Sequence, residues 1–493
     1  MKRDLTAITI LLFVWSNTML FARNGRDSIT TKKNADIIIS LNKNKPGIKI
    51  PDDFIGLSFE TGAVRKNNAR FDGYFFSPQN MQTVNIFRFL GIKNLRVGGG
   101  AVDFNKTFPT LADIDQLFGF AKLLNIKVVY SFKLLDGDVN ENVRIAKYIW
   151  SHYRDNLQCF AIGNEPDWDS YKKVDPEIKD YPTFLAKWKK MANAIVAAIP
   201  GAKFIGPDTG SNYPVPGVKK TYYMGQPWTV RFADDLKASN LILYLAQHNY
   251  VGEDAVAMNR SASYLISNML SADWTKIQYP LLLDSVLKPA INKGYTYRLT
   301  ESNSFSSAVP GGSNCNATAL FALDYLHWWS QHGCAGINFH NKQWVLNAPI
   351  LMNADGSLQM APICYGIKAF DVSGKGTTQP LQISNPQNVN CTAYGVRAKD
   401  TLYITIINKE HGSNLTDANV DLKLGAKINK AKYITLSTPN GNIAALSGLK
   451  LGGAAFKNDG TWTPQWKTVE NAGKGNLRVK VPASSAMIVK IPY

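Results

Sequence analysis

Residues 160–171 read FAIGNEPDWDSY, and this stretch decides how the rest of the chain is interpreted. An apolar run leads into Gly163, and Asn164 and Glu165 then stand directly before a proline. Glycine and proline are the residues that most often interrupt helices and strands, so a strand is expected to stop at this point. The stretch therefore predicts a buried strand whose carboxyl end carries a carboxylate.

The same pattern recurs between about residues 50 and 345. A short β-rich apolar run ends in polar or glycine residues, and a segment with the apolar period of an amphipathic helix follows. Strands that alternate with helices imply a parallel sheet, and eight such units predict a closed (β/α)8 TIM barrel in the α/β class. An open doubly wound sheet is the alternative, but GLSFETGAV (56–64) is not its glycine-rich phosphate turn. The eight runs are FIGLSFE (54–60), NLRVGGG (94–100), KVVYSFKL (127–134), CFAIGNEP (159–166), KFIGPDTG (203–210), LYLAQHNYV (243–251), YTYRLTESN (295–303) and AGINFHN (335–341).

The pattern of apolar and polar residues changes after about residue 370. Segments such as 392–410 and 476–493 alternate at period two between turns rich in Gly, Asn, Asp and Lys, which predicts a C-terminal antiparallel β-sandwich domain. Residues 35–42, ADIIISLN, form a lone strand with no helix after it, and this strand is expected to join the sandwich or, alternatively, to cap the barrel floor. The predicted regions are a signal peptide (1–22), a linker with the joining strand (23–49), a catalytic barrel (50–370) and a sandwich (371–493).

The N-terminal residues have the three parts of a signal peptide. Lys2 and Arg3 give a positive start, residues 8–14 are apolar, and Leu20 and Ala22 suit the positions before a cleavage site. The alternative is an N-terminal membrane anchor, but polar residues interrupt the run before it reaches the roughly 20 apolar residues that a span needs. We expect an exported periplasmic or extracellular protein with no stable membrane insertion after signal removal.

The charge and the cysteines exclude several classes of protein. The formal net charge is +18, but the lysines are spread along the chain rather than gathered on one element, which argues against nucleic acid as a partner. A generally basic surface that aids solubility is one interpretation, and an acidic polysaccharide as partner is the other. The five scattered cysteines contain no C-x-x-C pair, which excludes a zinc ribbon, although one bridge from Cys315 to Cys391 or Cys364 is possible. No metal-binding motif is found, and no cofactor is expected.

Two glutamates stand at the ends of predicted strands that face each other across the barrel. Glu165 ends the fourth strand and Glu301 ends the seventh. Active sites of TIM barrels lie at the carboxyl ends of the strands, so the two carboxylates can share one cleft. Most glycosidases use two carboxyl groups that flank the glycosidic bond. One donates a proton to the leaving oxygen, and the other acts as nucleophile or base. The alternative is that each carboxylate caps a helix by accepting backbone N–H groups.

These residues carry a resemblance. GNEP on a fourth strand, with a glutamate that ends the seventh, is similar to the large clan of retaining (β/α)8 glycosidases. Within that clan the chain resembles the heparanase and β-glucuronidase family, glycoside hydrolase family 79. The matching pieces run in family order and are LRVGGG, FAIGNEPDW, FIGPDTG, QHNY, RLTESNSF and ALDYLHWWSQHGCAGINFH.

The resemblance implies a role for each matching residue. Glu165 would be the general acid/base, and Glu301 would be the nucleophile. Tyr250 would hydrogen-bond Glu301, and Arg96 would favour its charged form, although Arg96 could also be a buried partner of a structural carboxylate. Asn164 would bind the sugar 2-hydroxyl. Other residues that could bind sugar hydroxyls are Glu60, His248, Asn338 and His340; for both histidines a structural role is the alternative, and Asp208 is expected to orient loops or cap a turn.

The chain departs from the family where uronides are gripped. Relatives that cut uronides usually follow the nucleophile with a tyrosine and a run of glycines, whereas this chain has SNSFSSAVPGGSN (302–314) without the tyrosine. The amides of Gly311 and Gly312 could still hold a sugar carboxylate. Trp168 and Trp228 are candidates for an aromatic platform under a sugar ring, while Trp328 and Trp329 are expected in the core. Lys133 or Lys342 could supply a compensating charge.

The sequence as a whole predicts a retaining β-glycosidase that acts by double displacement on an oligo- or polysaccharide, most simply a β-glucuronide. One alternative keeps the mechanism and changes the sugar to a neutral one. Another is a glycan-binding protein that no longer hydrolyses.

Overall fold

The computed structural model of the chain describes residues 36–42, 44–67, 72–168, 173–210, 222–223, 225–252, 254–413, 415–425, 428, 430–469 and 476–492. The predicted signal peptide (1–22) and most of the linker lie outside these residues. None of the described helices is long and apolar enough to cross a bilayer.

Eight parallel strands close into the predicted TIM barrel. The closure is made where the last strand pairs with the first, with Ile337 opposite Ile55 and His340 opposite Ser58. Most residues of the barrel strands are buried, and the polar residues Glu60, His248 and Glu301 lie toward the carboxyl ends of their strands. In chain order the barrel strands are β2 (Ile55–Glu60), β3 (Asn94–Gly98), β4 (Lys127–Phe132), β5 (Leu157–Ile162), β6 (Phe204–Thr209), β9 (Ile242–Tyr250), β10 (Tyr297–Asn303) and β11 (Cys334–His340).

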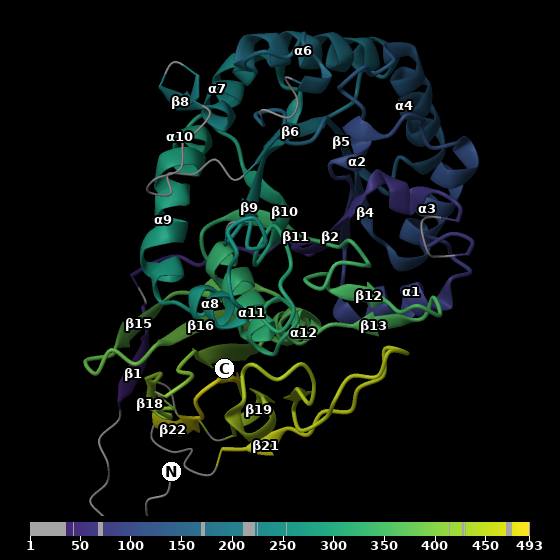
Figure 1. Cartoon of the computed structure of the whole chain (residues 1–493). Helices are drawn as coiled ribbons and strands as arrows, with labels where there is room; N and C mark the ends of the chain where they lie inside the picture. Colours follow the sequence, from purple (N-terminus) through teal and green to yellow (C-terminus); the bar gives the residue numbers. More distant parts are fainter. Residues whose placement is uncertain are drawn as a thin grey trace, which may run out of the picture. The chain divides into compact units, whose positions relative to one another are not determined.

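Helices cover the outside of the barrel (Figure 1). Their starts follow local chemistry: Thr110 and Asp113 form a capping box before α3, and Asp180 with Thr183 forms another before α6. Trp228 opens α7 and packs against the ring of Phe184, so this tryptophan belongs to the core and the prediction of a sugar platform is wrong for it. The helices are α1 (Met81–Leu90), α2 (Ala101–Phe104), α3 (Leu111–Leu124), α4 (Val139–Tyr153), α6 (Tyr181–Ala198), α7 (Trp228–Asp235), α8 (Ala262–Met269), α9 (Tyr279–Leu282), α10 (Lys288–Ile291), α11 (Ala317–Ser330) and α12 (Ile363–Ser373), and the short hairpin β12 (Ile350–Met352) with β13 (Leu358–Met360) follows the barrel.

The C-terminal segment forms two antiparallel sheets, with one parallel pairing made by the early strand. β1 (Ile37–Leu41) lies between β15 and β18 in the smaller sheet, and α12 runs across the expected boundary at residues 370 and 371. The smaller sheet contains β15 (Leu381–Ser384), β1, β18 (Ala418–Lys423) and β22 (Asn476–Val481). The larger contains β14 (Thr377–Gln379), β16 (Cys391–Ala398), β17 (Thr401–Asn408), β23 (Ser485–Pro492), β19 (Lys432–Ser437), β20 (Lys450–Leu451) and β21 (Lys467–Thr468).

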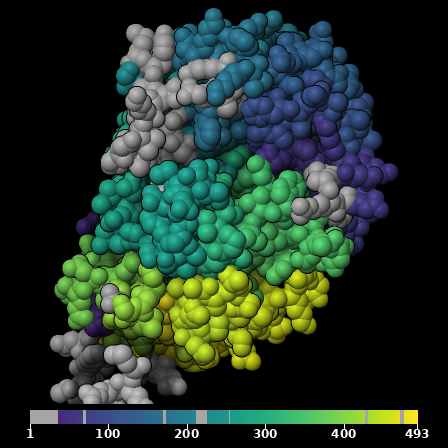
Figure 2. Space-filling model, in the orientation of Figure 1, coloured from purple at the N-terminus to yellow at the C-terminus, as the bar shows by residue number. Residues whose placement is uncertain are grey.

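The helix α11 joins the barrel to the larger sheet. Every residue of α11 is buried, including the predicted core pair Trp328 and Trp329. Its Asp324 accepts hydrogen bonds from Tyr394 (2.6 Å) and from the buried Lys409 (2.7 Å) of the sandwich. Figure 2 shows the yellow C-terminal residues packed directly against the green segment that precedes them. All five cysteines are free, so the disulfide considered from the sequence is not formed.

Candidate active site

A sharp turn after β5 presents Glu165. The strand ends at Ile162, Gly163 follows with φ of 81°, and Glu165 itself has φ of 49°. A side chain at position 163 would meet Leu134 at 2.9 Å, so glycine is required there both for space and for the left-handed backbone. The N–H of Glu165 donates to the carbonyl of Asp208, which also has a positive φ of 58°. The turn in GNEP is therefore fixed against the neighbouring strand.

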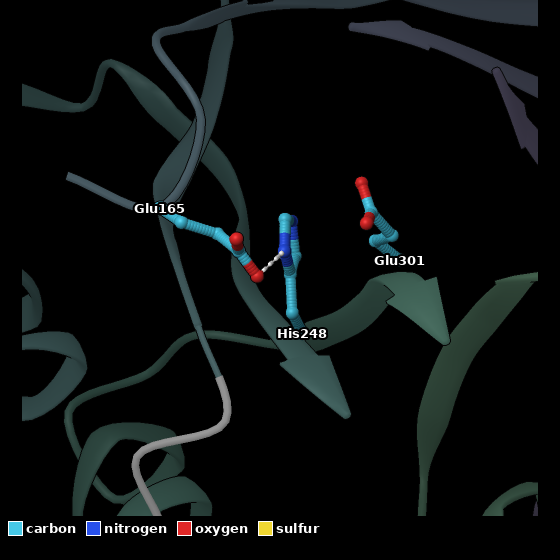
Figure 3. A group of neighbouring side chains, drawn as sticks. All are labelled: Glu165, His248 and Glu301. Carbon is cyan, nitrogen blue, oxygen red and sulfur yellow. Dashed lines mark hydrogen bonds and ion pairs between the residues drawn. The ribbon is translucent and has the colours of Figure 1, made fainter. Parts of the chain in front are cut away.

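Glu301 reaches the same place from β10. Figure 3 shows the ring of His248, from β9, between the two carboxylates. One oxygen of Glu165, one oxygen of Glu301 and a ring nitrogen of His248 all lie within 4.8 Å of one another. The two acids are thus as close as the roughly 5–5.5 Å typical of retaining glycosidases, and closer than the roughly 6.5–9.5 Å of inverting ones. The structure brings together the pair that the sequence predicted.

Arg96 binds the nucleophile candidate from β3. Its guanidinium is fully buried and donates to Glu301 (2.7 Å), to Asp208 (3.0 Å) and to Asn164 (2.8 Å). A fourth bond reaches the hydroxyl of Ser58 at 3.1 Å. The alternative considered for Arg96, a partner of a structural carboxylate, holds as well, because the same group binds both Glu301 and Asp208.

The surroundings keep Glu301 ionised. Burial by itself would raise the pKa of Glu301, but His340, His248 and Arg96 outweigh it, and the hydroxyl of Tyr250 donates to the same carboxylate at 2.7 Å. The pKa of Glu301 therefore lies well below its usual range. In turn, burial and the adjacent carboxylates of Glu301 and Glu165 raise the pKa of Tyr250 well above its usual value, so its hydroxyl stays a donor.

His248 links the two halves of the site. Its Nδ1 lies 2.9 Å from Glu165, and its Nε2 lies 3.4 Å from Asp208. Burial favours the neutral ring, but Glu301, Asp208 and Glu165 outweigh burial and raise the pKa of His248 to about 10. Asp208 is likewise buried, and Arg96 with His248 lowers its pKa to about 2. His248 and Asp208 are therefore oppositely charged at neutral pH, and this pair lies between Glu165 and Arg96, which each contact one of its members.

Glu60, at the end of β2, places a third carboxylate near Glu301, with His340 between them. Its carboxylate accepts from Lys342 at 2.8 Å and from the backbone N–H of Ala101 at 2.7 Å. His340 stands between Glu60 and Glu301, with one ring nitrogen 3.5 Å from each. Burial would raise the pKa of Glu60, but His340 and Lys342 lower it to about 2. The carboxylate can accept bonds from sugar hydroxyls, as the resemblance implied.

Three predicted binding residues lie elsewhere or are already engaged. Asn338 is fully buried two residues below His340, and it bonds Arg298 (2.8 Å) and Asn94 (2.8 Å) inside the barrel, so it cannot contact a sugar. The N–H of Gly311 donates to Asn314, and the N–H of Gly312 donates to Val309. These amides close their own loop, and the predicted uronate grip is therefore not formed by them.

Trp168 keeps the position that the sequence suggested. Half of its surface is exposed directly after the GNEP turn, and it packs close to Gly210 after β6. Asn164 is buried and receives Arg96, which fixes its side-chain oxygen. A half-exposed ring three residues after Glu165 can serve as a stacking surface for a sugar.

Two hydroxyl residues escaped the sequence reasoning. Ser58 bonds Arg96, and Thr300 donates to Asp208. Ser58 could have been found from strand periodicity, because it lies two residues before Glu60 and so on the same face. Thr300 could not, because β10 shifts register against β9 between Leu299 and Glu301, and this irregularity turns two consecutive side chains toward the same network.

The three groups of the site could also act as metal ligands by their chemistry. Within the described part of the chain, Glu165, His248 and Glu301 are the cluster whose ligand atoms converge. The carboxylate of Glu301 is already neutralised and hydrogen-bonded by protein groups, because Arg96 forms an ion pair with it and the hydroxyl of Tyr250 donates to it. The absence of a metal and of a cofactor stays a prediction.

The comparisons agree with the fold. No family model matches the sequence, and no curated protein sequence matches it. Among solved structures, a 4-O-α-L-rhamnosyl-β-D-glucuronidase from Fusarium oxysporum 12S is similar, with a TM-score of 0.68, 15% identity and coverage of 92% of this chain and 99% of the other. A family 51 arabinofuranosidase from Xanthomonas axonopodis pv. citri has a TM-score of 0.66 at 18% identity, covering 93% and 100%. A family 44 xyloglucanase from Paenibacillus polymyxa has a TM-score of 0.61 at 12% identity, covering 93% and 100%.

These likenesses show the architecture. The matched structures are named as glycoside hydrolases, and each is covered nearly end to end, barrel and sheet domain together. The identities are too low to transfer a substrate. The function must therefore be argued from the side chains at the barrel mouth.

Proposed function

We propose that the protein is a retaining glycoside hydrolase. The observation that carries this proposal is the short distance between the two carboxylates. An oxygen of Glu165 and an oxygen of Glu301 lie within 4.8 Å of each other, at the carboxyl ends of two different barrel strands. That spacing is shorter than the roughly 6.5–9.5 Å by which an inverting acid and base are separated, and it suits direct attack on the anomeric carbon. The charged Arg96 and the hydroxyl of Tyr250 hold Glu301 in the form that attacks.

The reaction divides into two displacements. In the first, Glu301 forms a bond to the anomeric carbon while Glu165 gives a proton to the departing glycosidic oxygen. In the second, Glu165 takes a proton from water, the water oxygen bonds the anomeric carbon, and the bond to Glu301 breaks. His248 keeps Glu165 oriented through both steps by its bond at 2.9 Å. The net configuration at the anomeric carbon is retained.

For the sugar, a β-glucuronide is proposed on the family resemblance, within a plant or host polysaccharide that an exported enzyme would meet. A second candidate, a neutral β-glycoside, is supported by Glu60. This carboxylate has a pKa of about 2 and stands beside the nucleophile, where it favours hydroxyls and opposes a uronate. Lys342, whose ammonium group bonds Glu60, is the nearby cation that could accept a sugar carboxylate.

A panel of aryl β-glycosides tests the proposal. It contains the glucuronide, the 4-O-methyl glucuronide, the glucoside and the xyloside, and product configuration is followed by NMR during the first turnovers. Hydrolysis with retention is expected, together with mass-spectrometric labelling of Glu301 by a 2-fluoro analogue of the best substrate. Inversion would refute the mechanism, and full activity of Glu301→Gln would refute the assignment. No turnover on any substrate would favour a glycan-binding protein.

A further inference from the structure

A second cavity lies at the opposite end of the barrel from the catalytic pair. It has a volume of about 910 Å³ and is bounded by the residues that precede the barrel strands and by an edge of the sandwich. Lys93 and Lys127 lie at the starts of β3 and β4, whereas the catalytic residues lie at the strand ends. A strand of six residues rises about 20 Å, so this cavity is separate from the active site.

The walls of this floor cavity are rich in cations. The barrel wall brings Lys93 and Lys127 side by side, because the N–H of Lys127 donates to the carbonyl of Lys93 at 3.0 Å. On the sandwich wall, Thr377 of β14 pairs with Lys49 on one side and with Arg397 on the other, so these two cations flank the same strand. The basic residues that line the cavity are Lys49, Lys93, Lys127, Lys375, Arg397 and Lys399.

The acidic residues of the cavity do not balance these cations. Two carboxylates line it, and Asp53 is already bound by Arg298 (3.2 Å), Asn94 and Gln158. Asp52 lies 3.8 Å from Lys49 with its side chain fully exposed. The described lining therefore carries six cations and two anions, one of which is committed to the barrel interior, and Asp371 just outside the lining opposes Lys375. Like charges gathered in a partly enclosed space repel each other, and an anionic ligand relieves that repulsion.

The pKa of Lys93 also reflects a neighbouring positive charge in this cavity. Burial lowers the pKa of Lys93, and the positive charge of Lys375 lowers it further, while Asp371 opposes the effect. Lys375 itself bonds Asp371 at 2.5 Å but keeps two thirds of its side chain exposed. Two ammonium groups from different elements are thus held within each other's field.

The lining chemistry favours an acidic glycan over a nucleic acid. Proteins that hold single-stranded nucleic acid stack its bases on aromatic rings, and none of the described residues that line this cavity is aromatic. Lysine outnumbers arginine five to one, whereas planar phosphate recognition favours arginine. Asn125 and Thr377 add neutral polar groups of the kind that bind hydroxyls, and the volume suits several sugar units within the usual range of about 300–1,000 Å³.

We propose that the floor cavity is a second carbohydrate-binding site, which holds a carboxylated or sulfated stretch of a polysaccharide remote from the bond being cut. The cavity and its charge stand on their own, while the glycan nature of the ligand rests on the proposed function. An extended chain held at this site would stay attached to the enzyme between cleavage events. The site also gives part of the +18 net charge a specific use.

Binding of a hexagalacturonate to the Glu301→Gln protein tests the proposal by calorimetry. We expect the added substitutions Lys127→Gln, Lys375→Gln and Lys399→Gln together to weaken binding at least tenfold and to reduce its salt dependence. A matched control changes three exposed lysines elsewhere, Lys122, Lys432 and Lys450, and should bind as before. The three cavity substitutions in the active enzyme should leave hydrolysis of small aryl glycosides unchanged.

Two further probes decide the identity of the ligand. A neutral hexasaccharide should not respond to the cavity substitutions. Equal loss of binding in the cavity and control variants would overturn the site, and tighter binding of a hexathymidylate than of the uronate would overturn the glycan assignment in favour of nucleic acid. If no glycoside is hydrolysed but uronate binding still depends on the cavity lysines, the enzymatic proposal fails while the binding site stands.

Discussion

Replacing Arg96 by methionine would remove the cation on which two buried carboxylates depend. The guanidinium is fully buried and bonds Glu301 at 2.7 Å and Asp208 at 3.0 Å. Methionine fills a similar apolar length but cannot donate, so both carboxylates would keep their charge without this partner or become protonated. Removing one partner of a buried ion pair costs about 3–5 kcal/mol.

The loss should depend on pH in a defined direction. Asp208 has a pKa lowered to about 2, and Glu301 is also lowered, so their ionised contacts stabilise the wild type above the unfolded value near pH 4. This contribution disappears as the pH falls through the folded pKa values. Without Arg96 both pKa values rise, and the contribution is absent. The difference in the free energy of unfolding between wild type and Arg96→Met should therefore be about 3–5 kcal/mol at pH 7 and shrink between about pH 4 and pH 2.

Catalysis should fall as well, by about 10²–10³-fold in kcat/KM at pH 7, the usual effect of losing one electrostatic group at a reacting centre. Urea denaturation and initial rates on the best aryl glycoside measure the two effects. Arg298→Met is the matched control, because Arg298 is equally buried in the barrel but bonds Asn338 and Asp53 away from the mouth. It should lose stability without a comparable loss of rate per folded molecule. An Arg96→Met enzyme within threefold of the wild-type rate, or a stability loss that is constant from pH 7 to pH 2, would refute this account of the site.

Three other variants test separate parts of the structure. Glu165→Gln should lose far more activity on substrates with poor leaving groups than on activated aryl glycosides, and azide should restore turnover of the latter; equal losses on both would remove Glu165 from the acid role. Tyr250→Phe removes one hydrogen bond to a charged group, worth about 1.5–3 kcal/mol, so the pKa of Glu301 should rise and the acid limb of kcat/KM should move to higher pH, and an unmoved limb would contradict it. Lys409→Met should cost about 3–5 kcal/mol of unfolding free energy by leaving Asp324 without its cation, and adding Asp324→Leu should recover most of the loss in a double-mutant cycle.

The barrel and its catalytic pair were predictable because both follow from periodicity. Alternating strand and helix patterns set the architecture, and the architecture sets which strand ends converge. Glu165 follows the end of the fourth barrel strand by three residues, and Glu301 lies two residues before the end of the seventh, so their meeting is a consequence of topology and needs no detail of packing. The strand and helix pattern was a strong indication of the fold because it recurs in eight successive units.

The predictions that were wrong concern residues whose role depends on how deeply the side chain is buried or on which hydrogen bonds the residue already makes. Period-two alternation puts Asn338 and His340 on the same face of β11, but it does not say that the first lies within the barrel and the second at its mouth. Glycine at 311 and 312 indicates a backbone that turns tightly, yet nothing in the residue type shows that the loop already uses both amides. Trp228 is amphipathic, and only its packing against Phe184 assigns it to the core.

Glu165 and Glu301 are chemically alike, and their surroundings suit them to the different tasks that we propose for them. Glu301 has 8% of its side chain exposed and is held ionised by Arg96 and Tyr250, which suits a nucleophile that must stay charged and dry. Glu165 has 18% of its side chain exposed and is oriented by the ring of His248, so water and the oxygen of a departing sugar can reach it. Asp208 connects the two environments, because it binds Arg96 on one side and His248 on the other while its carbonyl fixes the backbone of Glu165. A change at Asp208 should therefore disturb both carboxylates together, although it touches neither side chain.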